Sequence, residues 1–325
     1  MRTIQAPVPG GPEALQIVEA ERPVPGPGEV LVRIVASGVN RGDVLQRRGH
    51  YPPPPGFSDI LGLEASGVVE ALGEGTTGWE PGQECLVLLA AGGYAEYVTA
   101  PAGQLVPPPP GMDLVDAGAF LEVAATVVAN MDGVRLCAGE NFLVHGGAGG
   151  IGSFAIQYAK ALGCTVYTTS GSAEKLDYCR SLGADHPLDY HQDWVAATKE
   201  LTGGHGIDVT LDIIGAKYLT QNVTALARDG RLSIIGLQGG RKGELDLGML
   251  LNKRCSIHAA TLRGRPAEQK AAICARTVEA AWPMVADGSI KPLHTTRVPF
   301  SDVRRAHELI DSPGHRGKIV LVMDS

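Results

Sequence analysis

Residues 141–153 have the sequence Asn-Phe-Leu-Val-His-Gly-Gly-Ala-Gly-Gly-Ile-Gly-Ser. The apolar run 142–145 predicts a short buried strand. The pattern Gly147-x-Gly149-x-x-Gly152 follows, and an Ala-rich apolar run then predicts a helix that ends at Gly163. Strand, glycine turn and helix in this order are the context that a dinucleotide-binding fingerprint requires. We expect the phosphates to be held by the helix N-terminus and by Gly147, Ala148, Gly149, Gly150, Ile151 and Gly152.

The segment after the next predicted strand, 165–169, indicates which dinucleotide binds. An NAD-specific site places an Asp or Glu about 20 residues after the glycines. This region instead contains Thr168, Thr169 and Ser170, followed by Ser172 and Lys175. Hydroxyls and a cation suit a 2′-phosphate, whereas a carboxylate would repel it. The sequence therefore favours NADPH, although Ser172 could simply cap a helix and Lys175 could be a solvated surface lysine.

The composition is that of an ordinary globular protein. The 325 residues are 44% hydrophobic and 19% charged, which allows two domains with their own cores. The net charge of −7 argues against a general nucleic-acid or anionic-membrane surface. No apolar run of membrane length and no signal-peptide pattern is present. Six scattered cysteines without a Cys-x-x-Cys motif predict buried free thiols in a cytoplasmic protein.

The first 120 residues lack alternating strand and helix patterns. They contain short, Val-rich segments bounded by Gly or Pro, at 14–20, 29–36, 65–72, 84–89 and 94–100. Several short strands with such boundaries predict a compact, mostly antiparallel β-domain.

The rest of the chain has a different pattern. A helix is expected over 116–136, after which apolar strands alternate with helices. These strands are expected at 142–145, 165–169, 209–213, 232–235 and 256–261. Such alternation is typical of an α/β, doubly wound parallel sheet that binds its ligand at the carboxyl ends of the strands. A helix over 267–286, a strand near Thr296 and a strand over 318–323 complete the chain.

Gly215 and Gly236 each follow a predicted strand of this sheet. A glycine at this position lets the backbone approach the nicotinamide half of a cofactor closely. The alternative, equally compatible with the sequence, is that both are ordinary strand-ending turn residues.

Several ordered motifs resemble a known family. They are Asn40-Arg-Gly-Asp43, Gln46-Arg-Arg-Gly-His-Tyr-Pro-Pro-Pro-Pro-Gly56, Ile60-Leu-Gly-Leu-Glu-Ala-Ser-Gly67 and Gly92-Gly-Tyr-Ala-Glu-Tyr97. Together with the glycine fingerprint, they resemble the quinone oxidoreductase branch of the medium-chain dehydrogenase/reductase family over essentially the whole chain.

The resemblance implies two domains and an assembly. A GroES-like catalytic β-domain would comprise 1–121 and the C-terminal return 263–325, and a Rossmann NADPH-binding domain would comprise 122–262. The chain would form a homodimer by pairing the edge strand 256–261 with the same strand of a second copy.

Zinc-dependent members of this family carry metal ligands that this chain lacks. Asn40 replaces a catalytic Cys, and Leu63 of Gly62-Leu-Glu64 replaces a His. The family's four-cysteine zinc lobe would fall between about 85 and 110, where only Cys85 occurs. Zinc sites need three or four N, S or O ligands at fixed spacing, so we expect no metal.

Without a metal, side-chain donors must hold the oxygen of the substrate. Tyr51 is the first candidate because its phenol could donate to a quinone oxygen, and Asn40 is the second. Tyr51 could instead anchor the proline loop by packing, and Asn40 could be a turn residue bonded to the backbone. Asp43, Gln46 and Glu64 are weaker candidates, and Glu64 could instead be a buried structural carboxylate paired with Arg41.

The resemblance also carries over cofactor contacts. The glycine loop, Ser172 and Lys175 match the family's phosphate contacts, and Tyr190 matches a tyrosine that packs near the adenosine. Leu237, after Gly236, and Leu262-Arg263 fall where the family approaches the nicotinamide.

These expectations together imply NADPH-dependent hydride transfer to a quinone or a similar acceptor. An enone or enoyl-thioester reductase is an alternative on the same scaffold. A non-catalytic NADPH-binding redox sensor is another, because no single residue is an unmistakable nucleophile or base.

Overall fold

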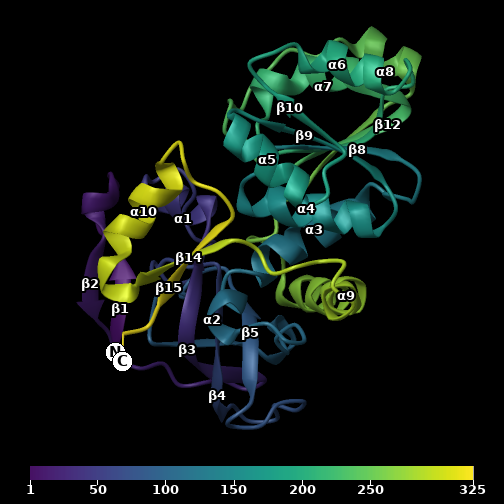
Figure 1. Ribbon diagram of the computed structural model, residues 1–325. Coiled ribbons are helices and arrows are strands. Elements are labelled where there is room, and N and C mark those ends of the chain that lie inside the picture. Colours follow the sequence, from purple (N-terminus) through teal and green to yellow (C-terminus); the bar gives the residue numbers. More distant parts are fainter. Residues whose placement is uncertain (325) are drawn as a thin grey trace. The chain divides into compact units, whose positions relative to one another are not determined.

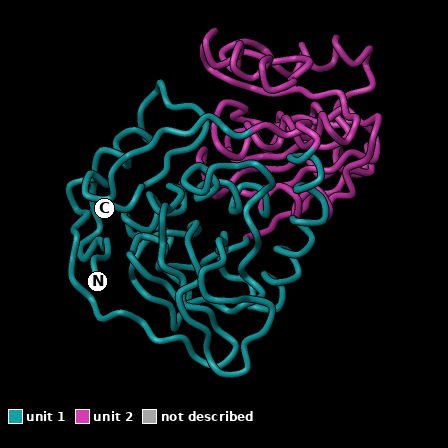
Figure 2. The backbone as a smooth tube through the Cα atoms, turned by 60° about the horizontal axis from the view of Figure 1, so that its bottom comes forward, with its two compact units in different colours: residues 1–125, 262–286, 292–325 teal, residues 126–261, 287–291 magenta. Residues whose placement is uncertain are grey.

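The computed structural model describes residues 1–324. The chain forms two compact units, coloured separately in Figure 2. The first unit comprises Met1–Ala125, Leu262–Ala286 and the chain from Pro292 onward. The second comprises Thr126–Thr261 and Asp287–Lys291.

The second unit is built on a six-stranded sheet in which every neighbouring pair is parallel. Its strand order is β10-β9-β8-β11-β12-β13. The strands are β8 (Asn141–His145), β9 (Thr165–Ser170), β10 (His186–Asp189), β11 (Ile207–Asp212), β12 (Leu226–Ile234) and β13 (Ser256–Ala259). This is the doubly wound parallel sheet that the alternating pattern predicts, with β8 at the point where the strand order reverses.

Helices cover both faces of this sheet. Figure 1 shows α3, α4 and α5 on one face and α6, α7 and α8 on the other. The helices are α3 (Leu121–Gly133), α4 (Gly150–Ala161), α5 (Ala173–Ser181), α6 (Trp194–Leu201), α7 (Leu219–Ala225) and α8 (Leu247–Lys253). Because both faces are covered, the central strands are buried, and Phe142, Leu143 and Val144 of β8 form a continuous buried apolar run.

The first unit contains a seven-stranded sheet in which only the pair β14–β15 is parallel. A separate antiparallel pair is formed by β1 (Arg2–Gln5) and β2 (Gln16–Glu19). The large sheet consists of β3 (Glu29–Val39), β4 (Glu64–Leu72), β5 (Glu84–Leu88), β6 (Tyr97–Pro101), β7 (Leu105–Val106), β14 (Thr295–Pro299) and β15 (Lys318–Val322). The predicted antiparallel β-domain is therefore confirmed.

The C-terminal segment completes this sheet. β15 lies antiparallel to β3, with Ile319 opposite Val39. The apolar side chains of this region form a core with α10. The helices of the unit are α1 (Arg41–Arg47), α2 (Leu114–Ala117), α9 (Ala267–Ala286) and α10 (Val303–Asp311).

The prediction of one continuous helix over 116–136 is wrong, because two helices occupy this region. α2 ends at Ala117 and α3 begins only at Leu121. Gly118 lies between them, and a Cβ there would be 2.9 Å from both the Ala36 carbonyl oxygen and Ser66 Oγ. The chain therefore bends where its backbone packs directly on β3 and β4.

The thiols are free, as expected, but they are not all buried. Cys85, Cys164, Cys179 and Cys274 are buried, whereas Cys137 is exposed and Cys255 is half-buried. Cys137 lies in the loop between α3 and β8, where no core covers it.

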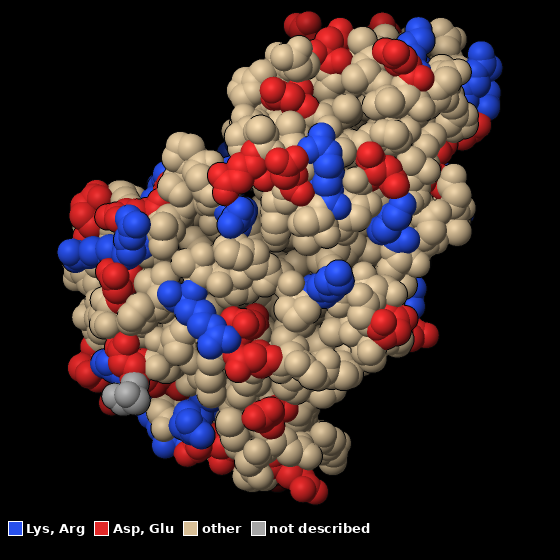
Figure 3. Space-filling model, in the orientation of Figure 1, with Lys and Arg blue, Asp and Glu red and all other residues tan. Residues whose placement is uncertain are grey.

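The surface mixes both signs of charge. On the face in Figure 3, Lys and Arg are interspersed with Asp and Glu rather than gathered into one basic patch. Over residues 1–324, no helix is both long and apolar enough to cross a lipid bilayer.

Candidate functional site

The glycine loop connects β8 to α4. Gly146, one residue before the fingerprint, has φ 71° and makes the turn in the left-handed region. A Cβ on Gly147 would lie 2.1 Å from Thr168 Oγ1, and one on Gly152 would lie 2.4 Å from the Gly146 carbonyl oxygen. These two glycines therefore allow close packing of the loop on β9 and of the helix on the loop.

Gly149 is different. It is the residue before α4 and has an extended backbone, with φ −80° and ψ 176°. A Cβ there would meet nothing closer than the Gly146 carbonyl oxygen at 3.5 Å. The space beside Gly149 is thus open at the N-terminus of a twelve-residue helix, where unpaired N–H groups and the helix dipole favour an anion.

The carboxyl end of β9 brings three of the predicted residues together. The Ser172 hydroxyl caps α5 by accepting a hydrogen bond from the Lys175 N–H at 3.3 Å. Tyr190 packs on Gly171, because a Cβ on Gly171 would lie 2.2 Å from the Tyr190 hydroxyl oxygen. The nearby Asp189 carboxylate accepts hydrogen bonds from the N–H and the ring of His191. Ser172 is exposed and the Tyr190 side chain is 45% exposed, so both are accessible to a ligand.

Gly215 and Gly236 lie at the ends of β11 and β12. Gly215 has φ 79°, and a Cβ there would lie 3.0 Å from Leu237 Cδ2. A Cβ on Gly236 would lie 2.7 Å from the Ile213 carbonyl oxygen. These predicted residues therefore meet each other at the carboxyl edge of the sheet, and Leu237 is 51% exposed there.

Sequence reasoning missed Asp212, the last residue of β11. Its carboxylate accepts hydrogen bonds from the N–H groups of Ile214 (2.7 Å) and Gly215 (3.0 Å) and so shapes this glycine turn. Burial raises the pKa of Asp212 to about 6. An Asp directly before a glycine turn at a strand end was the available signal.

His145 ends β8 directly before the glycine loop and is fully buried. Its ring packs edge-on to Trp194 and Tyr218, at centroid distances of 5.0 and 4.9 Å. The ring nitrogens lie 2.9 Å from Thr169 Oγ1 and 2.7 Å from Asn222 Oδ1. Burial lowers the pKa of His145 to about 4, so the ring is neutral at pH 7.

In the first unit, Asn40 belongs to a buried polar cluster at the start of α1. Its Nδ2 donates to Glu64 Oε1 at 2.9 Å, and its Oδ1 accepts from Lys318 Nζ. Lys318 also donates to Glu64 Oε1 at 2.8 Å, and the Glu122 N–H donates to Glu64 Oε2 at 2.9 Å. The Asn40 side-chain amide is therefore engaged by protein partners on both sides, with the residue 7% exposed.

Glu64 is buried, as expected, but the pairing with Arg41 is wrong. The partner of Glu64 is Lys318, and Arg41 instead binds Asp311. β15 lies next to β3, which places Lys318 beside the end of β3 and the start of β4. Arg41, in the first turn of α1, is partly exposed and close to α10.

A second buried network surrounds Asp43. Its carboxylate accepts from the Asn40 N–H (2.8 Å), the Gly62 N–H (3.1 Å) and the Tyr94 hydroxyl (3.3 Å). Burial raises the pKa of Asp43 to about 6. Burial together with the Arg47 cation lowers the pKa of His307 to about 3.

The hydrogen bonds of this network form a chain of donors that runs from Arg47 through His307 and Tyr94 to Asp43. Arg47 donates to His307 Nδ1 at 3.1 Å, so the proton of the neutral ring is on Nε2. His307 Nε2 lies 3.3 Å from the Tyr94 oxygen and can donate to it while Tyr94 donates to Asp43. The network fixes α1 against α10 and so positions both Asn40 and the loop that follows α1.

Tyr51 and Arg263 lie together in the first unit. The Arg263 guanidinium stacks over the Tyr51 ring, 4.9 Å from its centroid. Arg263 donates to the carbonyl oxygens of Ala90 (2.6 Å) and Tyr51 (2.8 Å) and to Gln46 Oε1. The edge of the Tyr51 ring also faces Gly42 of α1, since a Cβ there would lie 3.6 Å from Tyr51 Cε1.

The predicted residues thus form distinct groups. The glycine loop, the end of β9, and the glycines after β11 and β12 all lie on the carboxyl side of one sheet in the second unit. Asn40, Tyr51 and Arg263 lie around α1 in the first unit, and Leu262 precedes Arg263 there. Lys318 of the Asn40 cluster was missed, because nothing in the local sequence links β15 to Asn40.

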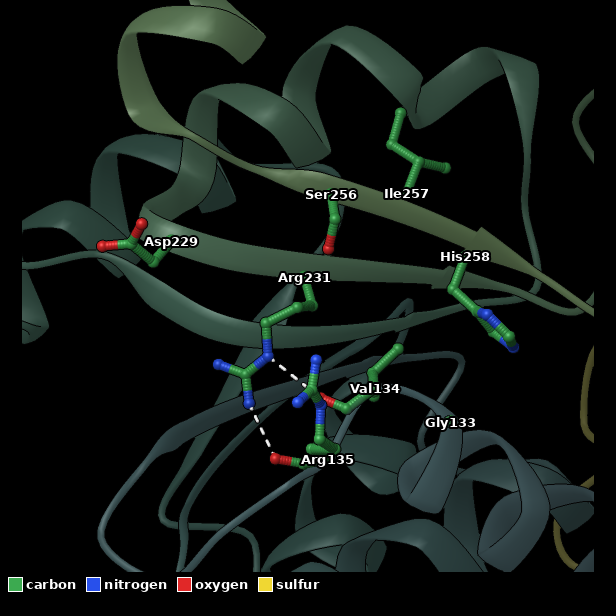
Figure 4. Close-up of a pocket in the computed structure, with 8 residues that line it drawn as sticks. All are labelled: Gly133, Val134, Arg135, Asp229, Arg231, Ser256, Ile257 and His258. Atoms are coloured by element: carbon green, nitrogen blue, oxygen red, sulfur yellow. Dashed lines mark hydrogen bonds between the residues drawn. The ribbon is translucent and has the colours of Figure 1, made fainter.

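The second unit also has a hollow of about 490 Å³ beside its edge strand β13. Figure 4 shows Arg231 held there by the carbonyl oxygens of Val134 and Arg135, with Ser256 and His258 of β13 nearby. None of the predicted site residues lines it. Among residues 1–324, no three His, Cys, Asp or Glu side chains are grouped so that they could hold a metal ion.

Comparison with known proteins defines the class. Residues 26–110 match the family described as "Alcohol dehydrogenase GroES-like domain", and residues 150–276 match "Zinc-binding dehydrogenase". The quinone oxidoreductase of Lama guanicoe is 31% identical over 99% of this chain and 98% of its own length. The chain therefore belongs to the medium-chain dehydrogenase/reductase family.

Solved structures agree with this class. The Escherichia coli quinone oxidoreductase complexed with NADPH has a TM-score of 0.89 and 29% identity, covering 99% of this chain and all of the other. A mycobacterial protein complexed with NADPH has a TM-score of 0.88 and 31% identity, with coverage of 99% and 100%.

Part of a much larger protein is also similar. A phenolphthiocerol/phthiocerol polyketide synthase of Mycobacterium tuberculosis is 31% identical over 98% of this chain. The chain spans 14% of the length of that synthase.

Proposed function

We propose that this chain is an NADPH-dependent, zinc-free oxidoreductase that transfers a hydride to a quinone. Full-length relatives named quinone oxidoreductase, at about 30% identity, support the acceptor class. The observation that carries the cofactor assignment is the end of β9, where Ser172 accepts the Lys175 N–H, Tyr190 packs on the adjacent Gly171, and the strand carries no carboxylate. Two similar proteins of known structure are complexed with NADPH.

The second unit has the features that this cofactor needs. The pyrophosphate would bind in the open space at Gly149, at the N-terminus of α4. Ser172 and Lys175 would bind the 2′-phosphate, and Tyr190 would pack near the adenosine. Gly215, Gly236 and Leu237 offer a close backbone approach at the nicotinamide end. Bound NADPH supplies the hydride.

In this proposal, residues of the first unit would donate hydrogen bonds to the acceptor. Negative charge develops on a quinone oxygen as it is reduced, and a positioned phenol can donate a hydrogen bond to it. Tyr51 is our first candidate, because the stacked Arg263 and the contact with α1 hold its ring in place. Asn40 is the second candidate: one N–H of its amide donates to Glu64, and its Nδ2 lies 3.5 Å from the Gly38 carbonyl oxygen, so the second N–H makes only a long hydrogen bond.

The test is stopped-flow oxidation of NADPH and NADH by a panel of ortho-quinones and para-quinones. We expect rapid oxidation of NADPH, a preference for NADPH over NADH, and slower turnover in Tyr51→Phe. Loss of one hydrogen bond made to a charge that develops in the transition state predicts a decrease of about tenfold or more in kcat.

Tight binding of NADPH without turnover of any quinone would reject the reductase and favour a redox sensor. A Tyr51→Phe variant with unchanged kcat and KM would instead remove Tyr51 from the reaction and leave the reductase assignment intact.

A second acceptor class is the conjugated C=C bond of an enone or enoyl thioester, because two proteins named enoyl reductase share this fold. The same panel therefore includes enones and enoyl thioesters. A higher kcat/KM for these than for every quinone would make the chain an enoyl reductase.

A further inference from the structure

Lys270 is a buried cation without an acceptor. It lies in the first turn of α9 and is 2% exposed. Among residues 1–324, no oxygen or nitrogen accepts a hydrogen bond from its ammonium, which instead faces the ring of Phe57, 5.5 Å away at its centroid. Buried ammonium groups are normally paired with a carboxylate or a carbonyl, so this one has an unfilled partner position.

The surroundings of Lys270 are positive. Burial, together with the Arg263 cation, lowers the pKa of Lys270. The N-terminus of the twenty-residue helix α9 adds a further partial positive charge. Cys274, one turn later, is no counter-charge, because burial raises the pKa of its thiol to about 12. The acid of this first turn, Glu268, is exposed.

Arg263 and Lys270 differ in whether they have hydrogen-bond acceptors. Arg263 is already satisfied by Ala90, Tyr51 and Gln46. Lys270 has no such acceptor, so an anionic group that enters this region would bind at the ammonium of Lys270.

Aromatic rings border both cations. The Tyr51 ring lies under Arg263, and the Phe57 ring lies against Lys270. Phe57 is 53% exposed, and the Lys270 ammonium is not among the fully buried atoms, so a ligand can reach it from the side of Phe57. A flat conjugated ligand could replace Phe57 over the ammonium.

We propose that Lys270 binds the carboxylate of an aromatic or conjugated acceptor, and that it gives the protein a preference for acceptors carrying one negative oxygen group. The identification of the ligand as the acceptor rests on the proposed reductase function. The carboxylate site itself does not, because it is defined by contacts within the first unit.

The alternative is a structural lysine held by its cation–π contact with Phe57. The two roles differ in stability. If the contact stabilises the fold, Lys270→Met lowers the melting temperature. If the ammonium is kept for a ligand, removing an unpaired buried charge leaves the melting temperature unchanged or raises it.

Calorimetric titration with 2-naphthoate and the uncharged 2-naphthamide tests the site without turnover. We expect the wild type to bind naphthoate about tenfold or more tightly than naphthamide, as a charge-assisted hydrogen bond requires. Lys270→Met should abolish this preference, and Lys270→Arg should retain much of it. Lys199→Met makes the same change at an exposed position and should behave as the wild type does.

A wild type without the preference, or a preference that survives in Lys270→Met, would overturn the proposal. So would a Lys270→Met variant that melts at a lower temperature and loses both ligands equally, since this is the behaviour of a structural lysine.

A second experiment links the site to the reaction. We compare a carboxylated naphthoquinone with its methyl ester and expect Lys270→Met to lower kcat/KM for the acid only, through KM. Binding of naphthoate through Lys270 without reduction of either quinone would reject the reductase and keep the carboxylate site. Equal kcat/KM for acid and ester in wild type and variant would overturn the role of Lys270 in acceptor choice.

Discussion

Single residues in this protein acquire their roles from neighbours that are far away in the sequence. Glu64 was expected to pair with Arg41, but its counter-ion is Lys318, 254 positions away. Both members of this ion pair are almost fully buried, with side chains 0% and 4% exposed. A buried carboxylate needs a cation and hydrogen bonds as partners, and β15 brings that cation.

His145 shows what burial does to a single titrating group. Its pKa of about 4 in the folded protein lies below the value of about 6.5 expected when the chain is unfolded. Between pH 4 and pH 6.5, His145 is therefore protonated in the unfolded state but neutral in the folded state. The stability that His145 contributes is complete above pH 6.5 and is lost as the pH falls toward 4.

We accordingly predict that the stability difference between wild type and His145→Gln depends on pH. From pH 7.5 to pH 5, the advantage of the wild type should shrink by about 2 kcal/mol, because about 1.5 pH units of proton uptake at 1.36 kcal/mol per unit act on the unfolded state. Urea unfolding at both pH values, followed by tryptophan fluorescence, measures this difference. A difference that is the same at both pH values would contradict a buried neutral ring.

At the scale of elements, the sequence pattern gives the type of each segment better than its ends. The alternating apolar runs correctly predict β8, β9, β11, β12 and β13, and helix α9 agrees with its expected bounds. β10 was missed because it is short and contains Pro187, and β1 and β7 were also missed. These strands are recognised by their pairing partners, which local periodicity does not show.

Two glycines of the turn between β8 and α4 have different roles. Gly152 allows close packing of the backbone, whereas Gly149 leaves space for a phosphate. At Gly152, a Cβ would meet the backbone of Gly146 and Gly147, at 2.4 and 2.5 Å, and backbone cannot move aside cheaply. At Gly149, a Cβ would fit the protein but would fill the space at the helix N-terminus. The two positions therefore form a matched pair for the same substitution.

We predict that Gly152→Ala loses about 1–3 kcal/mol of unfolding free energy through overpacking. Gly149→Ala should keep its stability within about 0.5 kcal/mol but raise the dissociation constant for NADPH about tenfold or more. Urea unfolding and the fluorescence of bound NADPH measure the two quantities. Wild-type affinity in Gly149→Ala would show that no phosphate lies beside this residue.

At the scale of the whole molecule, the parallel sheet leaves β13 as an edge strand. The Ala260 N–H points to the Ile234 carbonyl oxygen, and N–H directions alternate along a strand, so those of Ile257 and Ala259 point away from β12. An exposed edge of this kind can pair with a second copy. The homodimer therefore remains a prediction that the position of β13 permits.

Light scattering tests the predicted homodimer. We expect the wild type to have about twice the 34.0 kDa mass of one chain. Ala259→Lys should shift the mass toward one chain, because a lysine at a strand edge opposes pairing. Ala196→Lys, the same change at an exposed position of α6, serves as the control. A wild type with the mass of a single chain would reject the dimer.

The sequence by itself determined the two kinds of sheet, the glycine loop and the groups at the end of β9, because strand periodicity, turn chemistry and the fingerprint all act over a few neighbouring residues. Only the tertiary structure decided the partner of Glu64, the engagement of Asn40 by Lys318, and the burial of Lys270 beside Arg263. These depend on which strands and helices pack together, and a side chain's charge, exposure and free hydrogen-bonding positions follow from that packing rather than from its own local sequence.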